Sequence, residues 1–228
     1  MSKAQFVKQM FDDISSKYDL LNDILSLGMH RIWKKRFVQN VLKSTPKNIL
    51  DCATGTGDLA FYAEKLGGQK ILGIDFSEKM IDVAKARARL KHSATQFQTA
   101  DLTKLPFPDK SYDAAMVSFG VRNLDDLEHG LRELSRVSKT LSILEFGQPL
   151  NKIYSKTYFL ILRLYVPIFG LLTGRKDAYE YLIQSSEQFP SGPAFIEILK
   201  RNTDYKIFEY KSIFGGIAYA YQGSGEQS

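Results

Sequence analysis

From Asn48 onwards the sequence alternates short apolar runs with amphipathic stretches, and this alternation limits the possible folds more than any other feature. The apolar runs predict strands at residues 49–53, 70–75, 95–99, 112–118 and 141–146. The amphipathic stretches predict intervening helices at residues 58–66, 78–90 and 125–137. Because strands joined through helices favour right-handed crossovers, we expect a doubly wound α/β fold with a mostly parallel sheet and helices on both faces.

Helical patterns precede this alternating region and interrupt it near its end. Residues 4–43 read as helical segments with apolar side chains spaced for one face, and residues 154–201 are again helical and rich in Tyr, Phe and Leu. Two closing strands are predicted at residues 205–211 and 216–221. The second helical stretch is therefore an insertion before the last pair of strands, and we expect it to lie over the sheet as a lid.

Composition and charge exclude several classes of protein. With 44% hydrophobic and 25% charged residues, the chain is typical of a globular domain. Its one cysteine, Cys52, forms no intrachain disulfide and excludes a cysteine-only zinc site, so we expect a reducing compartment and no metal. No signal peptide is evident at the N-terminus. A spanning helix is not evident either, because Arg163 and Pro167 interrupt the most apolar stretch, residues 158–173. We expect a cytoplasmic protein whose net charge of +6 permits contact with nucleic acid or an anionic membrane.

The segment ILDCATGTGDLA, residues 49–60, predicts a strand that runs through a glycine turn into a helix. In an open α/β sheet such a turn lies at the carboxyl ends of the strands, where ligands bind. Gly55 and Gly57 allow the backbone to turn sharply and to approach a ligand closely. The same spacing also fits G-x-G-x-x-A, so a nicotinamide-dependent oxidoreductase remains an alternative.

Acidic residues at three successive strand ends favour S-adenosyl-L-methionine over a nicotinamide cofactor. Asp51 would attract the ammonium or sulfonium group of the methyl donor but repel a pyrophosphate. Asp75 is positioned to accept from both ribose hydroxyls. Asp101 is suited to accept from the adenine amino group while the Leu102 N–H donates to the ring. Each carboxylate alone could be a helix cap or turn group, but the three together predict a methyl donor.

Over nearly its whole length the chain resembles the UbiE/MenG type of ubiquinone/menaquinone biosynthesis C-methyltransferases. The stretches that carry the resemblance are residues 11–34 (FDDISSKYDLLNDILSLGMHRIWK), 105–109 (LPFPD), 118–123 (SFGVRN), 144–146 (LEF), 179–185 (YEYLIQS) and 216–223 (GIAYAYQG). The resemblance implies a Rossmann-like class I methyltransferase with a seven-stranded sheet, S-adenosyl-L-methionine as cofactor and a polyprenylated quinol as acceptor. It also implies cofactor contacts at Thr56 and Ser118, besides Asp75, Asp101 and Leu102, and it raises the expectation of a homodimer.

We expect a single methyltransferase domain over residues 1–228. Its four parts are an N-terminal helical cap (1–46), an S-adenosylmethionine-binding core (47–150), a helical lid (151–201) and closing strands (202–228).

Methylation of a quinol ring requires carbon as the nucleophile. A ring hydroxyl must lose its proton so that the adjacent carbon attacks the methyl group in line, which calls for alignment and for help with one proton. Arg122 and Asn123 are the predicted catalytic pair: Arg122 would stabilise the developing oxyanion, directly or through a water, and Asn123 would orient the ring. His30 is a further candidate because its ordinary pKa suits proton transfer. Other candidates for the quinol face are Tyr18, Asn22 and Trp33.

An isoprenoid tail would explain the aromatic, leucine-rich residues 154–172. They are suited to form an apolar tunnel mouth, to rest on the inner face of the cytoplasmic membrane, or to pack as an ordinary lid helix. The cations beside this stretch are Lys152, Lys156, Arg163, Arg175 and Lys176. Cations next to an apolar surface suit anionic headgroups, so peripheral contact with the membrane is one expectation.

Three departures from the family pattern concern the acceptor side and one connection. Residues 138–140 (SKT) replace a Lys-Pro-Gly-Gly turn, Tyr221-Gln222 replaces a His-Arg pair, and Glu187 stands where an Arg is usual. The exact acceptor therefore stays open between demethylmenaquinol and 2-methoxy-6-polyprenyl-1,4-benzoquinol, or a different acceptor. We favour menaquinone biosynthesis because the chain is short and has no N-terminal extension.

Two further alternatives use the same cofactor fold. A nucleic-acid methyltransferase would carry an Asn/Asp-Pro-Pro-aromatic motif after the fourth strand, where this chain has Ser-Phe-Gly, so we expect no nucleic-acid partner. A non-catalytic S-adenosylmethionine-binding protein would retain the same acidic residues.

Overall fold

The computed structural model describes residues 28–173 and 176–225, with isolated positions nearer the N-terminus at Val7, Gln9, Met10, Asp12, Asp13, Asp23 and Ser26. The side chains of residues 165–179 lie outside this description. Within the described part, no helix has both the length and the apolarity needed to cross a bilayer.

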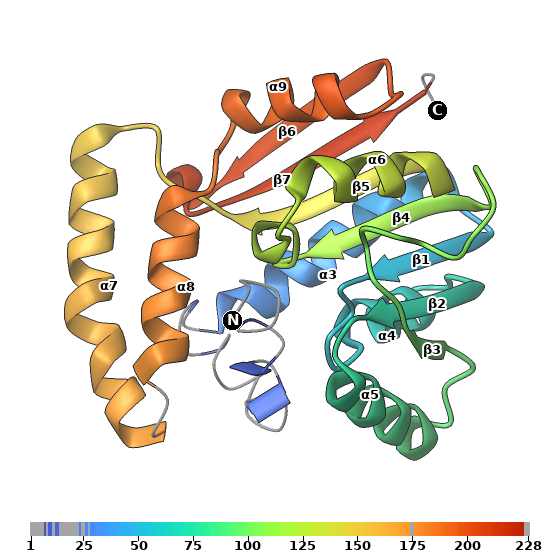
Figure 1. Ribbon diagram of the computed structural model, residues 1–228, viewed down its shortest axis with the longest axis horizontal. Coiled ribbons are helices and arrows are strands. Elements are labelled where there is room, and N and C mark those ends of the chain that lie inside the picture. The colour runs from blue at the N-terminus through green and yellow to red at the C-terminus, as the bar shows by residue number, and fades with distance from the viewer. Residues whose placement is uncertain are drawn as a thin grey trace.

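One sheet in the order β3-β2-β1-β4-β5-β7-β6 organises the molecule (Figure 1). Its strands are β1 (Asn48–Cys52), β2 (Lys70–Asp75), β3 (Gln96–Thr99), β4 (Tyr112–Ser118), β5 (Ser138–Phe146), β6 (Ile207–Ile213) and β7 (Ala218–Ser224). Neighbouring strands among β1 to β5 pair in parallel, and β7 pairs antiparallel with both β5 and β6. The predicted seven-stranded, mostly parallel α/β fold is confirmed.

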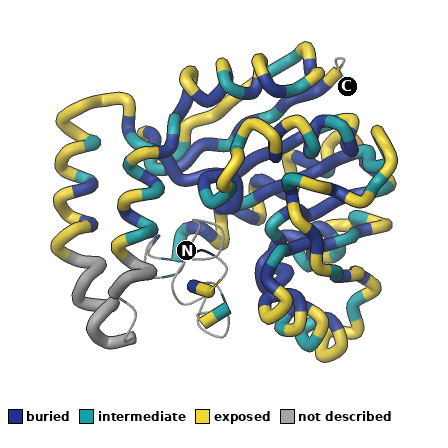
Figure 2. Tube along the Cα trace, in the orientation of Figure 1, coloured by how far each residue is buried: buried dark blue, intermediate teal, exposed yellow. Residues whose placement is uncertain are grey.

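Helices cover both faces of this sheet, as predicted. On one face pack α3 (Met29–Val41), α4 (Asp58–Lys65) and α5 (Glu78–Lys91), and on the other α6 (Leu127–Val137) and α9 (Pro193–Asn202). Figure 2 shows the strands between them as mostly buried. The apolar residues of the central strands, buried from both faces, account for the continuous hydrophobic runs in the sequence.

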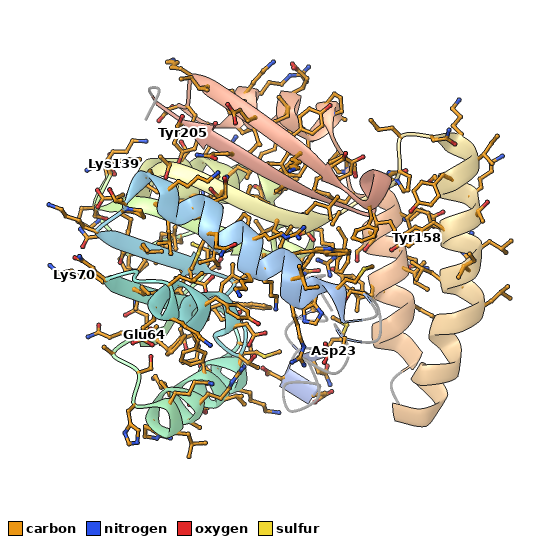
Figure 3. The ribbon with its side chains drawn as sticks, turned by 180° about the vertical axis from the view of Figure 1, so that it is seen from behind. Asp23, Glu64, Lys70, Lys139, Tyr158 and Tyr205 are labelled. Atoms are coloured by element: carbon orange, nitrogen blue, oxygen red, sulfur yellow. The ribbon has the colours of Figure 1, made fainter. Side chains whose placement is uncertain are left out.

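The helix hairpin of α7 (Lys152–Thr173) and α8 (Lys176–Gln188) stands beside the sheet instead of covering a face. The arrowheads of β4 and β5 point towards it in Figure 1. Figure 3 shows Tyr158 on this hairpin, with Lys70 and Lys139 at the opposite, amino-terminal ends of their strands. The hairpin therefore borders the carboxyl-end edge of the sheet, where ligands of α/β proteins bind.

The connection from α6 to β5 has no turn at all, because the helix ends at Val137 and the strand begins at Ser138. Lys110 Nζ donates to the carbonyls of Ser135 and Ser138, at 2.6 and 3.2 Å. Ser138 Oγ donates to the Leu134 carbonyl at 2.7 Å. Side chains thus satisfy carbonyl groups at the helix end that a glycine turn would otherwise satisfy. Strand β5 consequently starts three residues before the predicted residue 141.

The closing strands lie two residues later than predicted at their starts. Gly215 and Gly216, with φ of 67° and 109°, form the reversal between β6 and β7, so the chain turns there and β7 begins at Ala218. The sequence pattern places Gly215 in a loop and Gly216 at the start of the last strand. Because left-handed backbone does not continue a strand, Gly216 belongs to the reversal instead.

Candidate active site

A pocket lies where β1, β2, β3 and β4 end, and it encloses about 910 Å³ including space open to solvent. The lining residues are Ala53, Gly55, Asp75, Phe76, Met80, Asp101, Leu102, Thr103, Phe119, Gly120, Asn123, Leu124 and Asp125. The pocket therefore gathers residues that follow four different strands.

Left-handed backbone marks two neighbouring strand ends in this pocket. Ala53, after β1, has a φ of 51°, and Phe119, after β4, has a φ of 56°. Both are uncommon conformations for residues with a side chain and cost energy that the surrounding structure must supply. A Cβ on Gly120 would lie 2.6 Å from the Ala53 Cβ, so glycine is required for the two turns to touch. Strain concentrates where the pocket is formed.

Asp75 ties the glycine turn to β2. Its Oδ2 accepts from the Gly55 N–H at 2.9 Å, and its Oδ1 accepts from the Ser77 N–H at 3.0 Å. Burial raises the pKa of Asp75 to about 6 against the effect of these hydrogen bonds. Because each carboxylate oxygen has a second lone pair, Asp75 can hold the turn and still accept from two ligand hydroxyls.

Asp101 and Leu102 form the adjoining wall after β3. Asp101 Oδ1 accepts from the Thr103 N–H and hydroxyl, both at 2.8 Å, in a local turn. Leu102 is buried and lines the pocket, as do Met80 and Phe76. A carboxylate beside an apolar slot suits a planar base that carries an amino group.

Asp51 does not line the pocket, contrary to our expectation that it meets a cationic ligand there. Its Oδ2 accepts from Thr54 Oγ1 at 2.5 Å and from the Ala60 N–H at 3.1 Å. It is fully buried, and burial raises its pKa to about 7. Asp51 therefore holds the glycine turn against the start of α4.

Thr56, Gly57 and Ser118 are likewise absent from the pocket lining. Arg87 Nη1 donates to the Thr56 hydroxyl at 2.6 Å and to its carbonyl at 2.9 Å. A Cβ on Gly57, whose φ is 91°, would lie 2.8 Å from the Phe61 ring. Ser118 ends β4 opposite Leu144. These residues shape the turns, whereas Gly55, Asp75, Asp101 and Leu102 reach the pocket.

Arg122 lies behind the pocket wall in a buried ion pair. Its Nη1 donates to Glu145 Oε1 at 2.5 Å and to the Phe119 carbonyl at 2.7 Å. Its backbone N–H donates to Glu145 Oε2 at 3.3 Å. Burial raises the pKa of Glu145, and the Arg122 charge opposes that rise. The guanidinium thus supports the 3-10 turn Val121–Asn123, and direct contact of Arg122 with an oxyanion in the pocket is not what this geometry offers.

Asn123 lines the pocket, and its role in orienting the ring stays a prediction. Its Nδ2 donates to the Phe119 carbonyl at 3.3 Å, and its Oδ1 accepts from the Tyr181 hydroxyl of α8 at 3.1 Å. The amide is thereby oriented from both ends.

Of the N-terminal candidates that the structure describes, neither His30 nor Trp33 is among the pocket-lining residues. His30 is buried beside Ser26, with Nδ1 and Oγ 2.8 Å apart, and burial lowers its pKa to about 4, with Lys34 adding to the effect. At neutral pH His30 is therefore uncharged and a weak base. Trp33 packs its ring against Phe146, 6.4 Å between centroids. Tyr18 and Asn22 lie outside the described residues.

Sequence reasoning missed Phe119, Glu145 and Tyr181. Only Glu145 left a readable signal, since an acidic residue inside an apolar strand must be paired. The left-handed conformation of Phe119 and the contact of Tyr181 with Asn123 depend on the assembled fold.

Two of the departures have structural partners. Glu187 accepts from Arg163 Nη2 at 2.5 Å and so joins α8 to α7. The Tyr221 hydroxyl accepts from the Gly192 N–H at 2.8 Å, and its ring packs against Phe195. Each of the two residues thus takes part in contacts between neighbouring elements of the fold.

Comparison with known proteins agrees with this fold. The magnesium protoporphyrin IX methyltransferase of Synechocystis, solved with bound S-adenosylhomocysteine, superposes with a TM-score of 0.68 at 17% identity, over 97% of this chain and 98% of that one. Fold and pocket together define a Rossmann-like methyltransferase that uses S-adenosyl-L-methionine.

The sequence model of the ubiE/COQ5 methyltransferase family matches residues 1–224, so the chain belongs to that family. It is 36% identical to the ubiquinone/menaquinone biosynthesis C-methyltransferase UbiE of Bdellovibrio bacteriovorus, over 96% of each chain. It is also 36% identical to the demethylmenaquinone methyltransferase of Deinococcus radiodurans, over 97% of this chain and 93% of the relative. The predicted family and cofactor are confirmed.

Proposed function

We propose that this enzyme transfers the methyl group of S-adenosyl-L-methionine to a ring carbon of a polyprenylated quinol, converting demethylmenaquinol to menaquinol. The observation that carries the proposal is the two-sided pocket, with carboxylates after β2 and β3 on one side and aromatic and amide groups after β4 on the other. The names of the relatives support a quinone precursor as acceptor.

The donor side is assigned to the residues after β1, β2 and β3. Asp75 accepts from the two ribose hydroxyls, Asp101 from the adenine amino group, and the Leu102 N–H donates to the ring. When bound, S-adenosylmethionine supplies an electrophilic methyl group on a sulfonium. The residues hold that group at the β4 side of the pocket, where an acceptor can approach in line.

The acceptor side is assigned to Phe119 and Asn123. The Phe119 ring stacks on Phe146 with 4.2 Å between centroids, so it offers a rigid apolar surface to a planar quinol. Asn123 orients the ring by hydrogen bonding. The buried pair of Arg122 and Glu145 keeps the turn that carries Asn123 in place.

We also propose that α7 is the surface that meets the bilayer in which the acceptor is held. Ile153, Leu160 and Leu164 are 78%, 56% and 68% exposed, and their spacing of seven and four residues places them on one helical face. Phe159 and Leu162 are buried on the other face. A helix that is apolar on its outer face as well needs a second apolar environment.

The charge of α7 favours an anionic lipid surface. Its sequence contains no Asp or Glu, and exposed Lys152 and Lys156 flank the outer apolar residues. Figure 2 shows exposed residues along the outer side of this helix. Basic side chains around an apolar face favour binding in the headgroup region.

The test is methyl transfer from labelled S-adenosylmethionine to chemically reduced demethylmenaquinone and, in parallel, to the reduced 2-methoxy-6-polyprenyl-1,4-benzoquinone, followed by mass spectrometry. A gain of one methyl group on a ring carbon of the first acceptor supports the proposal. A gain on the second alone would assign the enzyme to ubiquinone biosynthesis. No gain on either acceptor would contradict quinol methylation, provided that a separate experiment shows that the same protein binds S-adenosylhomocysteine.

A further inference from the structure

Arg87 of α5 joins two residues of the glycine turn between β1 and α4. Its Nη1 donates to the Thr56 carbonyl at 2.9 Å and to the Thr56 hydroxyl at 2.6 Å. Its Nη2 donates to Asp58 Oδ1 at 2.8 Å, and Asp58 is the first residue of α4. One guanidinium group therefore bridges the end of the turn and the start of the helix that follows it.

This bridge is held by charge as well as by hydrogen bonds. Lys34 of α3 donates to the second carboxylate oxygen, Asp58 Oδ2, at 3.2 Å. Burial raises the pKa of Asp58, but the charges of Lys34 and Arg87 outweigh that effect and lower the pKa to about 2. The carboxylate is thus ionised at neutral pH, where charge-assisted hydrogen bonds are the stronger kind.

The backbone that Arg87 holds is the most flexible kind. Gly55 and Gly57 have φ of 57° and 91°, and glycine loses more conformational freedom on folding than any other residue. Gly55 lines the pocket, and its N–H donates to Asp75. Arg87 does not line the pocket, but it fixes the residue that follows Gly55. It can therefore act on the pocket wall only through the turn.

The strand order indicates which part of the methyl donor meets this wall. The order β3-β2-β1-β4 places the glycine turn, which follows β1, between Asp75 after β2 and Asn123 after β4. In the donor assignment above, the adenine lies at Asp101 and the ribose at Asp75. The next part of the donor, the amino-acid chain on the sulfur, then falls at Gly55.

We propose that Arg87 is a positioning residue for the methyl donor: by bridging Thr56 and Asp58, it holds the glycine turn in the shape that receives the amino-acid portion of S-adenosylmethionine. This assignment rests on the donor side of the proposed function and is independent of which acceptor is methylated.

The experiment measures the binding of two thioethers to the wild-type enzyme and to Arg87→Met by isothermal titration calorimetry. They are S-adenosylhomocysteine and 5′-methylthioadenosine, which shares the adenosine and the sulfur but lacks the amino-acid chain. We expect the Kd for S-adenosylhomocysteine to rise roughly five- to thirtyfold, the cost of ordering the backbone of one further residue on binding. The Kd for 5′-methylthioadenosine should change little, because this ligand does not reach the turn.

Arg136→Met is the matched control. The side chain of Arg136 in α6 is 32% exposed, against 28% for Arg87. Its Nη1 also donates to a loop carbonyl, that of Phe107 at 2.7 Å, and to a carboxylate, Asp109 Oδ1 at 2.8 Å. None of these three residues lines the pocket, so both Kd values should stay near those of the wild type. An equal loss of S-adenosylhomocysteine affinity in this control would overturn the proposal. So would an equal loss for both ligands in Arg87→Met, or no loss for either.

Arg87→Lys tests the bridge itself. Lysine keeps the positive charge but offers one nitrogen in place of the two that reach Thr56 and Asp58. We expect a smaller loss than in Arg87→Met, again confined to S-adenosylhomocysteine, and this variant carries the test if Arg87→Met does not fold. Wild-type affinity in Arg87→Lys would show that charge alone suffices and would overturn the bridging role.

The binding comparison is separate from the test of the proposed function, because neither thioether requires an acceptor. A selective loss of S-adenosylhomocysteine affinity without methyl transfer to either quinol would support Arg87 and contradict the function. Methyl transfer to a quinol without the selective loss would do the reverse.

Discussion

The two sides of the pocket are built by different means. On the donor side, buried Asp75 accepts from the backbone of its own turn and of the neighbouring glycine turn. On the acceptor side, an ion pair between Arg122 and Glu145 supports a turn whose Asn123 depends on α8. The donor side therefore rests on hydrogen bonds within the sheet edge. The acceptor side rests on a charge pair and on the position of an inserted helix, so the two sides can be damaged separately.

The largest expected effect is on stability and comes from Glu145→Ala. Removing this carboxylate leaves the Arg122 charge buried without its partner, which typically costs about 3–5 kcal/mol. The free energy of unfolding from urea denaturation measures it. Asp101→Ala, which removes an exposed carboxylate from the donor side, should cost much less.

A paired replacement sharpens this result. Arg122→Met combined with Glu145→Leu should recover a large part of the loss, because an apolar pair carries no desolvation penalty. A loss below about 1 kcal/mol in Glu145→Ala would show that the acceptor wall does not depend on the ion pair.

Asp75→Asn should damage the donor side alone. We expect the Kd for S-adenosylhomocysteine to rise roughly ten- to a hundredfold, since hydrogen bonds to a charged group are lost. Isothermal titration calorimetry measures it. Asn123→Ala should show the reverse pattern, with a raised KM for the acceptor and a nearly unchanged Kd for the donor product. If both variants change both constants equally, the two sides are one unit.

The same contrast explains how far the sequence could predict this site. Asp75 and Asp101 both line the pocket, and the sequence could place them at this edge because Asp75 ends one recognisable strand and Asp101 comes shortly after another. Asp51, near the end of β1, does not line the pocket, since sequence gives the strand end but not the face of the turn. The parallel sheet was predictable for a similar reason, because the alternation of apolar runs and amphipathic stretches can be recognised locally in the sequence.

The acceptor side could be predicted only in part. The resemblance directed attention to Arg122 and Asn123, but their surroundings depend on partners 23 and 58 positions away. No periodicity reports such contacts. The left-handed backbone at Phe119 is equally invisible, because an aromatic residue gives no sign of it.

A pH titration tests the donor side with a smaller expected effect. The pKa of Asp75 in the free protein is raised to about 6, and an ionised carboxylate accepts more strongly from ribose hydroxyls. The affinity for S-adenosylhomocysteine should therefore fall about tenfold from pH 7 to pH 5. The sign for stability is opposite: the raised pKa stabilises the free protein below about pH 4, and this contribution is lost as the pH rises through 6.

The variant Asp75→Asn separates this group from its neighbour. Asp51 also titrates in this range, with a pKa raised to about 7. A flat binding profile in Asp75→Asn assigns the dependence to Asp75, whereas an unchanged slope would transfer it to Asp51 and contradict the prediction.

The smallest effect is expected from the charges beside the outer face of α7, which extends the acceptor side towards the lipid. Lys156→Gln should weaken binding to vesicles of phosphatidylserine and phosphatidylcholine about fivefold, because each cation near an anionic surface contributes about 1 kcal/mol. Co-sedimentation at fixed ionic strength measures it. Lys70→Gln removes the same charge from the opposite end of the sheet (Figure 3) and should leave vesicle binding nearly unchanged. If both variants weaken binding equally, the net charge of the protein and not the face of α7 determines contact with the membrane.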